Sequence, residues 1–275
     1  MKRKFILMLL VISKISAAQY YYNDIIANKL SSKQFKLLQA NNFRKVSAKS
    51  YDGNGNNSTD FFLEQLFNNN FTQSVTNSKI VSGISSTLVT NFENNHVIST
   101  NEISKGIENI VHYTYNNDST IKSIIAISKD TALNISSTEN HLWNYATNGK
   151  PVSMTCIKNN SDTTTVLLMI DENGNVAEER WSKKGKEIEH YFYYYNQKNE
   201  LTDIVRFNNR AKKLLPDFLF EYDEQGRIQK MTQVPAANSN YLVWTYLYNA
   251  KGLKQTEICI NRKKELIGKI EYSYE

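Results

Sequence analysis

The sequence is poor in the residues that most often build catalytic and metal centres. Its 275 residues include only 2 cysteines, 4 histidines and 3 prolines. Two cysteines cannot supply a zinc site alone, and no histidine lies at metal-ligand spacing from another histidine, a cysteine or an acid. A glycine-rich phosphate loop and a serine nucleophile elbow are also missing. We therefore predict no catalytic residue, no metal site and no cofactor, and we interpret His141 as a packed or edge histidine.

Paired acidic residues are the remaining route to catalysis, because a secreted β-protein with two facing carboxylates can hydrolyse glycans. The pairs Asp171–Glu172 and Asp223–Glu224 fall where turns are expected. Glu178 and Glu179 are adjacent on an expected strand, so their side chains point to opposite faces. A glycan hydrolase is therefore an alternative, and we predict that the protein is not an enzyme.

The sequence also lacks an apolar run long enough to cross a bilayer. Residues 5–12 are apolar, but a membrane-spanning helix needs about 20 such residues. Basic residues at 2–4 precede this run and small residues at 16–18 follow it, which is the pattern of a signal peptide cleaved before Gln19. We expect a periplasmic or secreted bacterial protein that is not transmembrane after cleavage.

An excess of charge of one sign is nearly absent from the mature chain. The net charge is +6, from 33 basic and 27 acidic residues. Residues 1–18 hold four of the basic residues and no acid, so their removal leaves 29 against 27, or +2. The basic balance is thus partly a property of the signal peptide, and it gives no evidence for a nucleic-acid partner.

Aromatic residues are abundant, with 17 tyrosines and 12 phenylalanines. Such residues favour strands, and here they recur every 25 to 30 residues, which indicates an internal repeat. We anchor each unit on the large apolar residue that precedes a turn. The anchors are Tyr115, Tyr145, Ile170, Tyr195, Tyr222, Tyr248 and Tyr274, with Phe92 and Tyr51 as weaker earlier ones.

Each unit has the pattern of a β-hairpin. The residues two and four before each anchor are apolar or aromatic with one exception, so they share one face of a strand. In "YDEQGR", Asp223 can open a type I turn and Gly226 can take the left-handed position of a bulged three-residue loop, which places Tyr222 opposite Ile228. Leu253 comes one residue early in its unit, which predicts a local slip of register.

These units predict a mostly all-β fold, a long antiparallel meander of about 14 to 16 strands. Both strand faces are partly apolar, so we expect the sheet to curl or fold on itself. Apolar residues at helical spacing over 23–42 predict one N-terminal helix that covers the first sheet edge. The predicted organisation is a signal peptide over 1–18, a helix and lead-in over 19–50, and a β-hairpin repeat domain over 51–275, clearest over 111–275.

The two cysteines occupy equivalent strands four units apart. Cys156 and Cys259 each lie 11 residues after an anchor. Four units of a meander separate them by roughly 38 Å, whereas a disulfide needs Cα atoms within about 7 Å. We predict two free thiols unless the sheet closes.

The motif aromatic-x-Tyr-Asp/Asn-x-x-Gly-x-aliphatic resembles the YD repeat of bacterial RHS proteins. "FEYDEQGRI" is the best match, and "YYYNQKNEL", "YLYNAKGL" and "YTYNNDSTI" are degraded copies. In that family the repeats coil into large β-shells that enclose or display other polypeptides. The resemblance implies stacked hairpins and an exported or surface setting, and no toxin module or catalytic residue is carried over from it.

We interpret the protein as an exported, non-enzymatic β-repeat protein that acts as a binding or scaffolding module in the cell envelope. The alternatives are a carrier that holds a lipid or other apolar ligand in a curled aromatic sheet, and a secreted glycan hydrolase. The expected partner is an anionic envelope polymer, a lipid headgroup or another envelope protein. The candidate binding residues are Lys183, Lys184, Lys212, Lys213, Arg262, Lys263, Lys264 and Trp181.

A transmembrane β-barrel is the main structural rival, because a signal peptide and strands of about ten residues fit one. The strands that return from each turn argue against it. "NVAEERW" and "RIQKMTQ" carry charged residues on both faces. A lipid-facing wall would not accept those charges near mid-depth.

Overall fold

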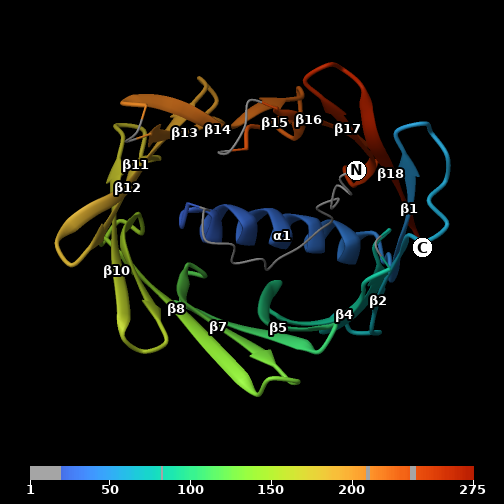
Figure 1. Ribbon diagram of the computed structural model, residues 1–275, viewed down its shortest axis with the longest axis horizontal. Helices are drawn as coiled ribbons and strands as arrows, with labels where there is room; N and C mark the ends of the chain where they lie inside the picture. The colour runs from blue at the N-terminus through green and yellow to red at the C-terminus, as the bar shows by residue number, and fades with distance from the viewer. Residues whose placement is uncertain (1–19, 82, 209–210, 236–239) are drawn as a thin grey trace.

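A computed structural model describes residues 20–81, 83–208, 211–235 and 240–275. These residues form a closed barrel of 18 antiparallel strands with a helix inside it (Figure 1). The predicted signal peptide over residues 1–18 lies outside the described residues. Within the described ranges, no helix has the length and apolar character needed to cross a membrane.

The elements follow one another in a simple order along the chain. The helix α1 spans Asn23–Ala40 and precedes all the strands. The strands are β1 (Lys45–Asp52), β2 (Phe62–Phe67), β3 (Gln73–Lys79), β4 (Ser85–Glu93), β5 (His96–Ser104), β6 (Ile107–Tyr115), β7 (Ile121–Asp130), β8 (Ile135–Tyr145), β9 (Pro151–Lys158), β10 (Asp162–Ile170), β11 (Val176–Lys183), β12 (Lys186–Tyr195), β13 (Leu201–Asn208), β14 (Lys213–Tyr222), β15 (Ile228–Gln233), β16 (Leu242–Tyr248), β17 (Lys254–Asn261) and β18 (Leu266–Tyr274).

The barrel closes because its first and last strands pair. Every strand pairs with the next one in the chain, and β1 pairs with β18 from Val46↔Tyr274 to Asp52↔Gly268. Closure satisfies the backbone groups that an open edge would expose. The prediction of a meander that curls or folds on itself was therefore wrong, because the sheet closes into a barrel, and the predicted number of strands was too low.

The resemblance to the YD repeat of RHS proteins was also wrong. The hairpins join into one closed 18-stranded barrel and not into the extended shell of that family. The local hairpin signature was read correctly, but a signature shared by many hairpins does not determine how they assemble.

The turn geometry follows the prediction. Tyr222 pairs with Ile228 across a bulge, and Gly226 has a φ of 69°. The predicted slip after Gly252 does not occur, because Tyr248 pairs with Lys254 in the same bulged register. Lys254 therefore takes the place of an aliphatic residue and points into the barrel.

The aromatic face of the strands lines the lumen. Trp143, Tyr191 and Tyr193 are buried there, whereas Leu167 and Met169 lie exposed on the outer wall. With about 4.8 Å between strands the wall is roughly 86 Å around, so its own side chains cannot fill the lumen. The interior is occupied in part by α1.

The helix was predicted correctly, but its place was not. It was expected to cover a sheet edge, and instead it crosses the lumen from the wall near β10–β12 to the wall near β1 and β2 (Figure 1). Its 18 residues span about 27 Å. The closed barrel has no edge to cover, so the apolar side of α1 packs inside.

Candidate binding site in the barrel lumen

The N-terminal end of α1 is held by a buried carboxylate on β11. Glu179 is 0% exposed and accepts hydrogen bonds from the backbone N–H groups of Tyr21 at 2.7 Å and Tyr22 at 2.9 Å. It also accepts from the Trp181 indole N–H and the Tyr193 hydroxyl. A carboxylate at this point satisfies the N–H groups of the two residues that precede α1 and complements the dipole of the helix.

Burial raises the pKa of the Glu179 carboxyl, and these four donors act in the opposite direction. The four donors suit an acceptor-only group, which is the ionised carboxylate. Glu179 is thus the point at which the wall and the helix are joined.

A second polar contact lies in the first turn of α1. Asp24 accepts a hydrogen bond from the Trp143 indole at 3.1 Å and lies 2.7 Å from His141 Nδ1. His141 Nε2 lies 2.9 Å from Glu139, which in turn pairs with Lys158 at 3.2 Å. Burial alone would lower the pKa of His141, but Asp24 and the other partners outweigh it and raise that pKa well above its usual range.

The C-terminal half of α1 is held by apolar contacts. Phe35 stacks on Phe92 of β4 with ring centroids 4.1 Å apart. Leu38 is 2% exposed and belongs to the same apolar cluster as Val46 of β1 and Ile270 of β18. Polar bonds at one end and apolar packing at the other therefore fix α1 across the barrel.

The packing of α1 is one-sided. Its buried residues Ile25, Phe35 and Leu38 belong to the apolar clusters formed with the barrel wall. Leu30, by contrast, is 49% exposed even though it lies within the barrel. A cavity of about 840 Å³ remains between α1 and the walls. Leu30 lines this cavity together with Ile26 and Leu37 of the same helix.

The opposite wall of the cavity is apolar and aromatic. Phe218, Phe220, Ile228, Met231 and Tyr246 contribute to it from β14, β15 and β16. These residues alternate with outward-facing ones, because side chains on a strand point to the two faces in turn. The cavity therefore has an apolar sheet on one side and, on the other, a helix face that carries both apolar and polar residues.

Most charged groups that line the cavity are already paired. Lys183 bonds Asp162 at 2.6 Å, and Lys254 bonds Glu257 at 2.9 Å. Lys254 also lies 4.3 Å from the ring centroid of Tyr246. Because these charges are neutralised locally, the lining favours a mainly uncharged, apolar occupant.

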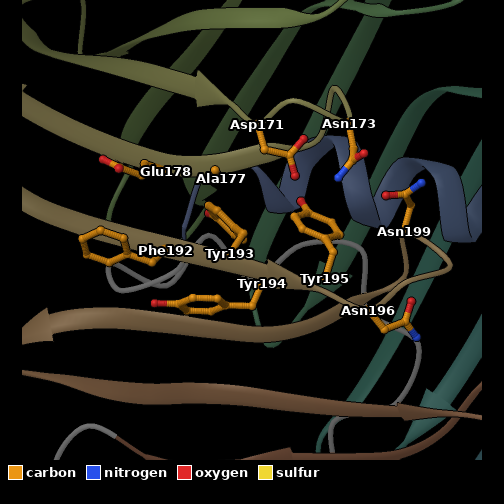
Figure 2. Close-up of a pocket in the computed structure, with 10 residues that line it drawn as sticks. All are labelled: Asp171, Asn173, Ala177, Glu178, Phe192, Tyr193, Tyr194, Tyr195, Asn196 and Asn199. Atoms are coloured by element: carbon orange, nitrogen blue, oxygen red, sulfur yellow. The ribbon is translucent and has the colours of Figure 1, made fainter.

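A smaller hollow of about 360 Å³ lies along β11 and β12 and the turns beyond them. Figure 2 shows Tyr193, Tyr194 and Tyr195 beside Asp171 and the asparagines of these turns. Tyr194 is 46% exposed, so this hollow is part of the outer surface and offers little enclosure.

The predicted binding residues divide into two groups. Trp181 is buried in the lumen, where it bonds Glu179 and packs against Tyr21 with ring centroids 4.5 Å apart. The basic residues lie in or beside the turns that follow β11, β13 and β17, which share one rim of an antiparallel barrel. They are Lys183, Lys184, Lys212, Lys213, Arg262, Lys263 and Lys264.

Sequence reasoning missed Asp24, Glu139, Cys156 and Glu179. Glu139 and His141 are two residues apart, in phase with the aromatic face, and this was the available signal. Cys156 lies 15 residues beyond His141 and meets it because the two residues pair across neighbouring strands. Spacing along the chain does not detect side chains that meet across a hairpin.

Comparison with solved structures finds matches at low sequence identity. The chain is similar to a porin-like protein from Bacteroides uniformis ATCC 8492, with 12% identity and a TM-score of 0.41 over 85% of this chain and 96% of that one. A porin-like protein from Bacteroides vulgatus ATCC 8482 has 9% identity and a TM-score of 0.29, over 85% and 98% of the two chains.

Part of a much longer chain is also similar. The crystal structure of TcdB2-TccC3-Cdc42 matches with 13% identity and a TM-score of 0.38, over 79% of this chain and 12% of that one. No family model matches the sequence, and no curated protein does.

Proposed function

We propose that this protein is a non-enzymatic binding protein of the bacterial envelope that holds an apolar molecule in its barrel lumen. The observation that carries the proposal is the cavity between α1 and the wall, in which Leu30 is left uncovered. Leu30 is half exposed inside a closed barrel and faces a cavity of about 840 Å³. Apolar surface that is left uncovered in a pocket is a typical ligand site, and this volume suits a ligand of drug or lipid size.

The outer wall supports an aqueous setting for this barrel. Glu178 and Arg180 form an ion pair at 2.7 Å in the middle of β11, and Lys269 and Glu271 form one at 2.6 Å in β18. Charges at mid-depth destabilise a lipid-facing wall. β2 and β15 have only six residues each, which is shorter than the 9 to 11 or so that a bilayer-spanning strand needs.

An environment-sensitive apolar fluorophore tests the proposal. The purified protein should bind the probe with an increase in fluorescence, and long-chain fatty acids should displace it. Met231→Trp adds volume to the cavity wall and should weaken probe binding at least tenfold. Leu247→Trp is the matched control, because Leu247 is 47% exposed on the outer wall. The proposal is wrong if the wild-type protein does not bind the probe, or if both variants weaken binding equally.

Scaffolding of an envelope partner is the second candidate function. It is favoured by the basic rim, which is the end of the barrel where the basic turns after β11, β13 and β17 lie. The turns after β13 and β17 present Lys212, Lys213, Lys263 and Lys264 to solvent. Such lysines also keep β-proteins soluble, so the rim needs its own binding test.

A further inference from the structure

Three potential metal ligands meet on the lumen face of β8 and β9. They belong to Glu139, His141 and Cys156, whose ligand atoms, one from each residue, all lie within 4.8 Å of one another. The Glu139 oxygen lies 2.9 Å from His141 Nε2 and 3.5 Å from Cys156 Sγ. Adjacent strands bring them together, because His141 pairs directly with Cys156 in the β8–β9 register.

This spacing suits a zinc coordination sphere. Zinc binds histidine nitrogen, carboxylate oxygen and cysteine sulfur at about 2.0 to 2.3 Å in tetrahedral geometry. Neighbouring ligand atoms in such a sphere are then roughly 3.3 to 3.7 Å apart, as follows from these bond lengths. The observed separations need only small side-chain adjustments to reach these values.

The surroundings of the cluster also match a metal site. A histidine that binds a metal usually donates its other ring N–H to a carboxylate, which fixes the ring and its tautomer. Here His141 Nδ1 lies 2.7 Å from Asp24, which is held by the Trp143 indole. The second oxygen of Glu139 is held by Lys158 at 3.2 Å.

We propose that Glu139, His141 and Cys156 bind one divalent transition-metal ion, with Zn²⁺ as the preferred occupant. On binding, the metal takes the place of the proton that joins His141 Nε2 to Glu139 and of the thiol proton of Cys156. The bond between His141 Nδ1 and Asp24 stays in place. Glu139 and His141 line the lumen cavity, so a water molecule or a small ligand can complete the fourth position.

Metal binding would also stiffen the barrel interior. Asp24 belongs to α1, whereas the three ligands belong to the wall. A metal that fixes His141 therefore fixes its partner on α1 as well, and it should raise the melting temperature of the protein. This inference does not depend on the lumen carrying an apolar ligand.

Cobalt spectroscopy provides the test. Tag-free protein is treated with a chelator and titrated with Co²⁺ at neutral pH. We expect a thiolate-to-cobalt charge-transfer band that saturates at one equivalent and disappears when Zn²⁺ is added. Cys156→Ser should abolish the band. Asp24→Asn should keep the band and weaken Zn²⁺ binding by about 10- to 100-fold, as outer-shell changes typically do.

Cys259→Ser is the matched control. Cys259 is as buried as Cys156, at 1% against 0% exposed, and occupies the equivalent strand of a later unit. This variant should retain the charge-transfer band and the metal affinity. The proposal is overturned if wild-type protein gives no band, or if the two cysteine variants behave alike.

A measurement on wild-type protein covers the case in which Cys156→Ser does not fold. The alkylation rates of the two thiols are followed by peptide mass spectrometry with and without saturating Zn²⁺. Zinc should slow alkylation of Cys156 more than tenfold and leave Cys259 nearly unchanged. Equal protection of both thiols, or protection of neither, overturns the proposal.

Discussion

The hydroxyl of Tyr222 donates a hydrogen bond of 2.7 Å to the backbone carbonyl oxygen of Leu201. Leu201 lies six residues after the preceding anchor, Tyr195, and pairs with it across the bulge. The same bond recurs from Tyr195 to Val176, from Tyr248 to Ile228 and from Tyr274 to Lys254. These four units are thus tied through their anchor tyrosines to the turn of the unit before them, which gives a reason for tyrosine at these anchors.

Tyr222→Phe should lower the free energy of unfolding by about 1 kcal/mol, because it removes this hydrogen bond and leaves the ring in place. Chemical denaturation followed by circular dichroism measures the effect. Tyr194→Phe is the control, since Tyr194 is 46% exposed on the outer wall. Equal stability of the two variants would mean that the bond contributes nothing.

Gly226→Val should destabilise the protein by about 1 to 2 kcal/mol, because a β-branched residue resists the positive φ of this turn. The measurement is the denaturation midpoint. Gly226→Asn is the control, because asparagine also has a Cβ but tolerates the left-handed region. The loss should therefore be smaller for asparagine, and an unchanged midpoint for valine would contradict the turn assignment.

Glu179→Gln should destabilise the protein by about 2 kcal/mol or more, because glutamine offers an N–H group where four donors converge. Glu178→Gln is the matched control, as Glu178 lies next to it and forms a partly exposed ion pair with Arg180. That substitution should cost less than about 1 kcal/mol. If Glu178→Gln destabilised the protein more than Glu179→Gln, Glu179 would not be the residue that holds the start of α1.

Stability should depend on pH through Glu179. Burial raises the pKa of its carboxyl, so the folded protein holds the proton more tightly than the unfolded chain. The resulting stabilisation is fully present below the unfolded pKa of about 4.3 and is lost as the pH rises through the higher folded pKa. The difference in unfolding free energy between wild type and Glu179→Gln should therefore narrow from acidic to neutral pH. A difference that widens would show that the four donors outweigh burial.

The basic rim should bind anionic vesicles or envelope polysaccharide in a salt-dependent way. Attraction between exposed charges is screened within roughly 8 Å at physiological salt, so binding should fall steeply as salt is added. Changing Lys212, Lys213, Lys263 and Lys264 together to Gln should weaken it further. Absence of binding at low ionic strength would leave the rim as a solubility device.

Local periodicity was sufficient to predict the hairpins. Spacing of two placed Trp143 and Tyr193 on one face, and the loop ending at Gly226 placed Tyr222 opposite Ile228. These features depend on residues close in sequence, where side-chain alternation and backbone φ leave few options. Helical spacing of the apolar residues likewise predicted α1. This spacing shows which side of the helix is buried, and it does not depend on the surface against which that side packs.

Only the tertiary structure decided that the barrel closes, where α1 lies and which polar groups meet. The pairing of β1 with β18 is made by backbone groups such as those of Lys45 and Glu275, which carry no sequence signature. Closure depends on the twist and stagger accumulated over 18 strands. The sequence of a single unit does not determine these totals. Once the wall closes, α1 has only the lumen in which to bury its apolar side. Glu179 on β11 then meets the start of the helix, and Asp24 on α1 meets His141 on β8.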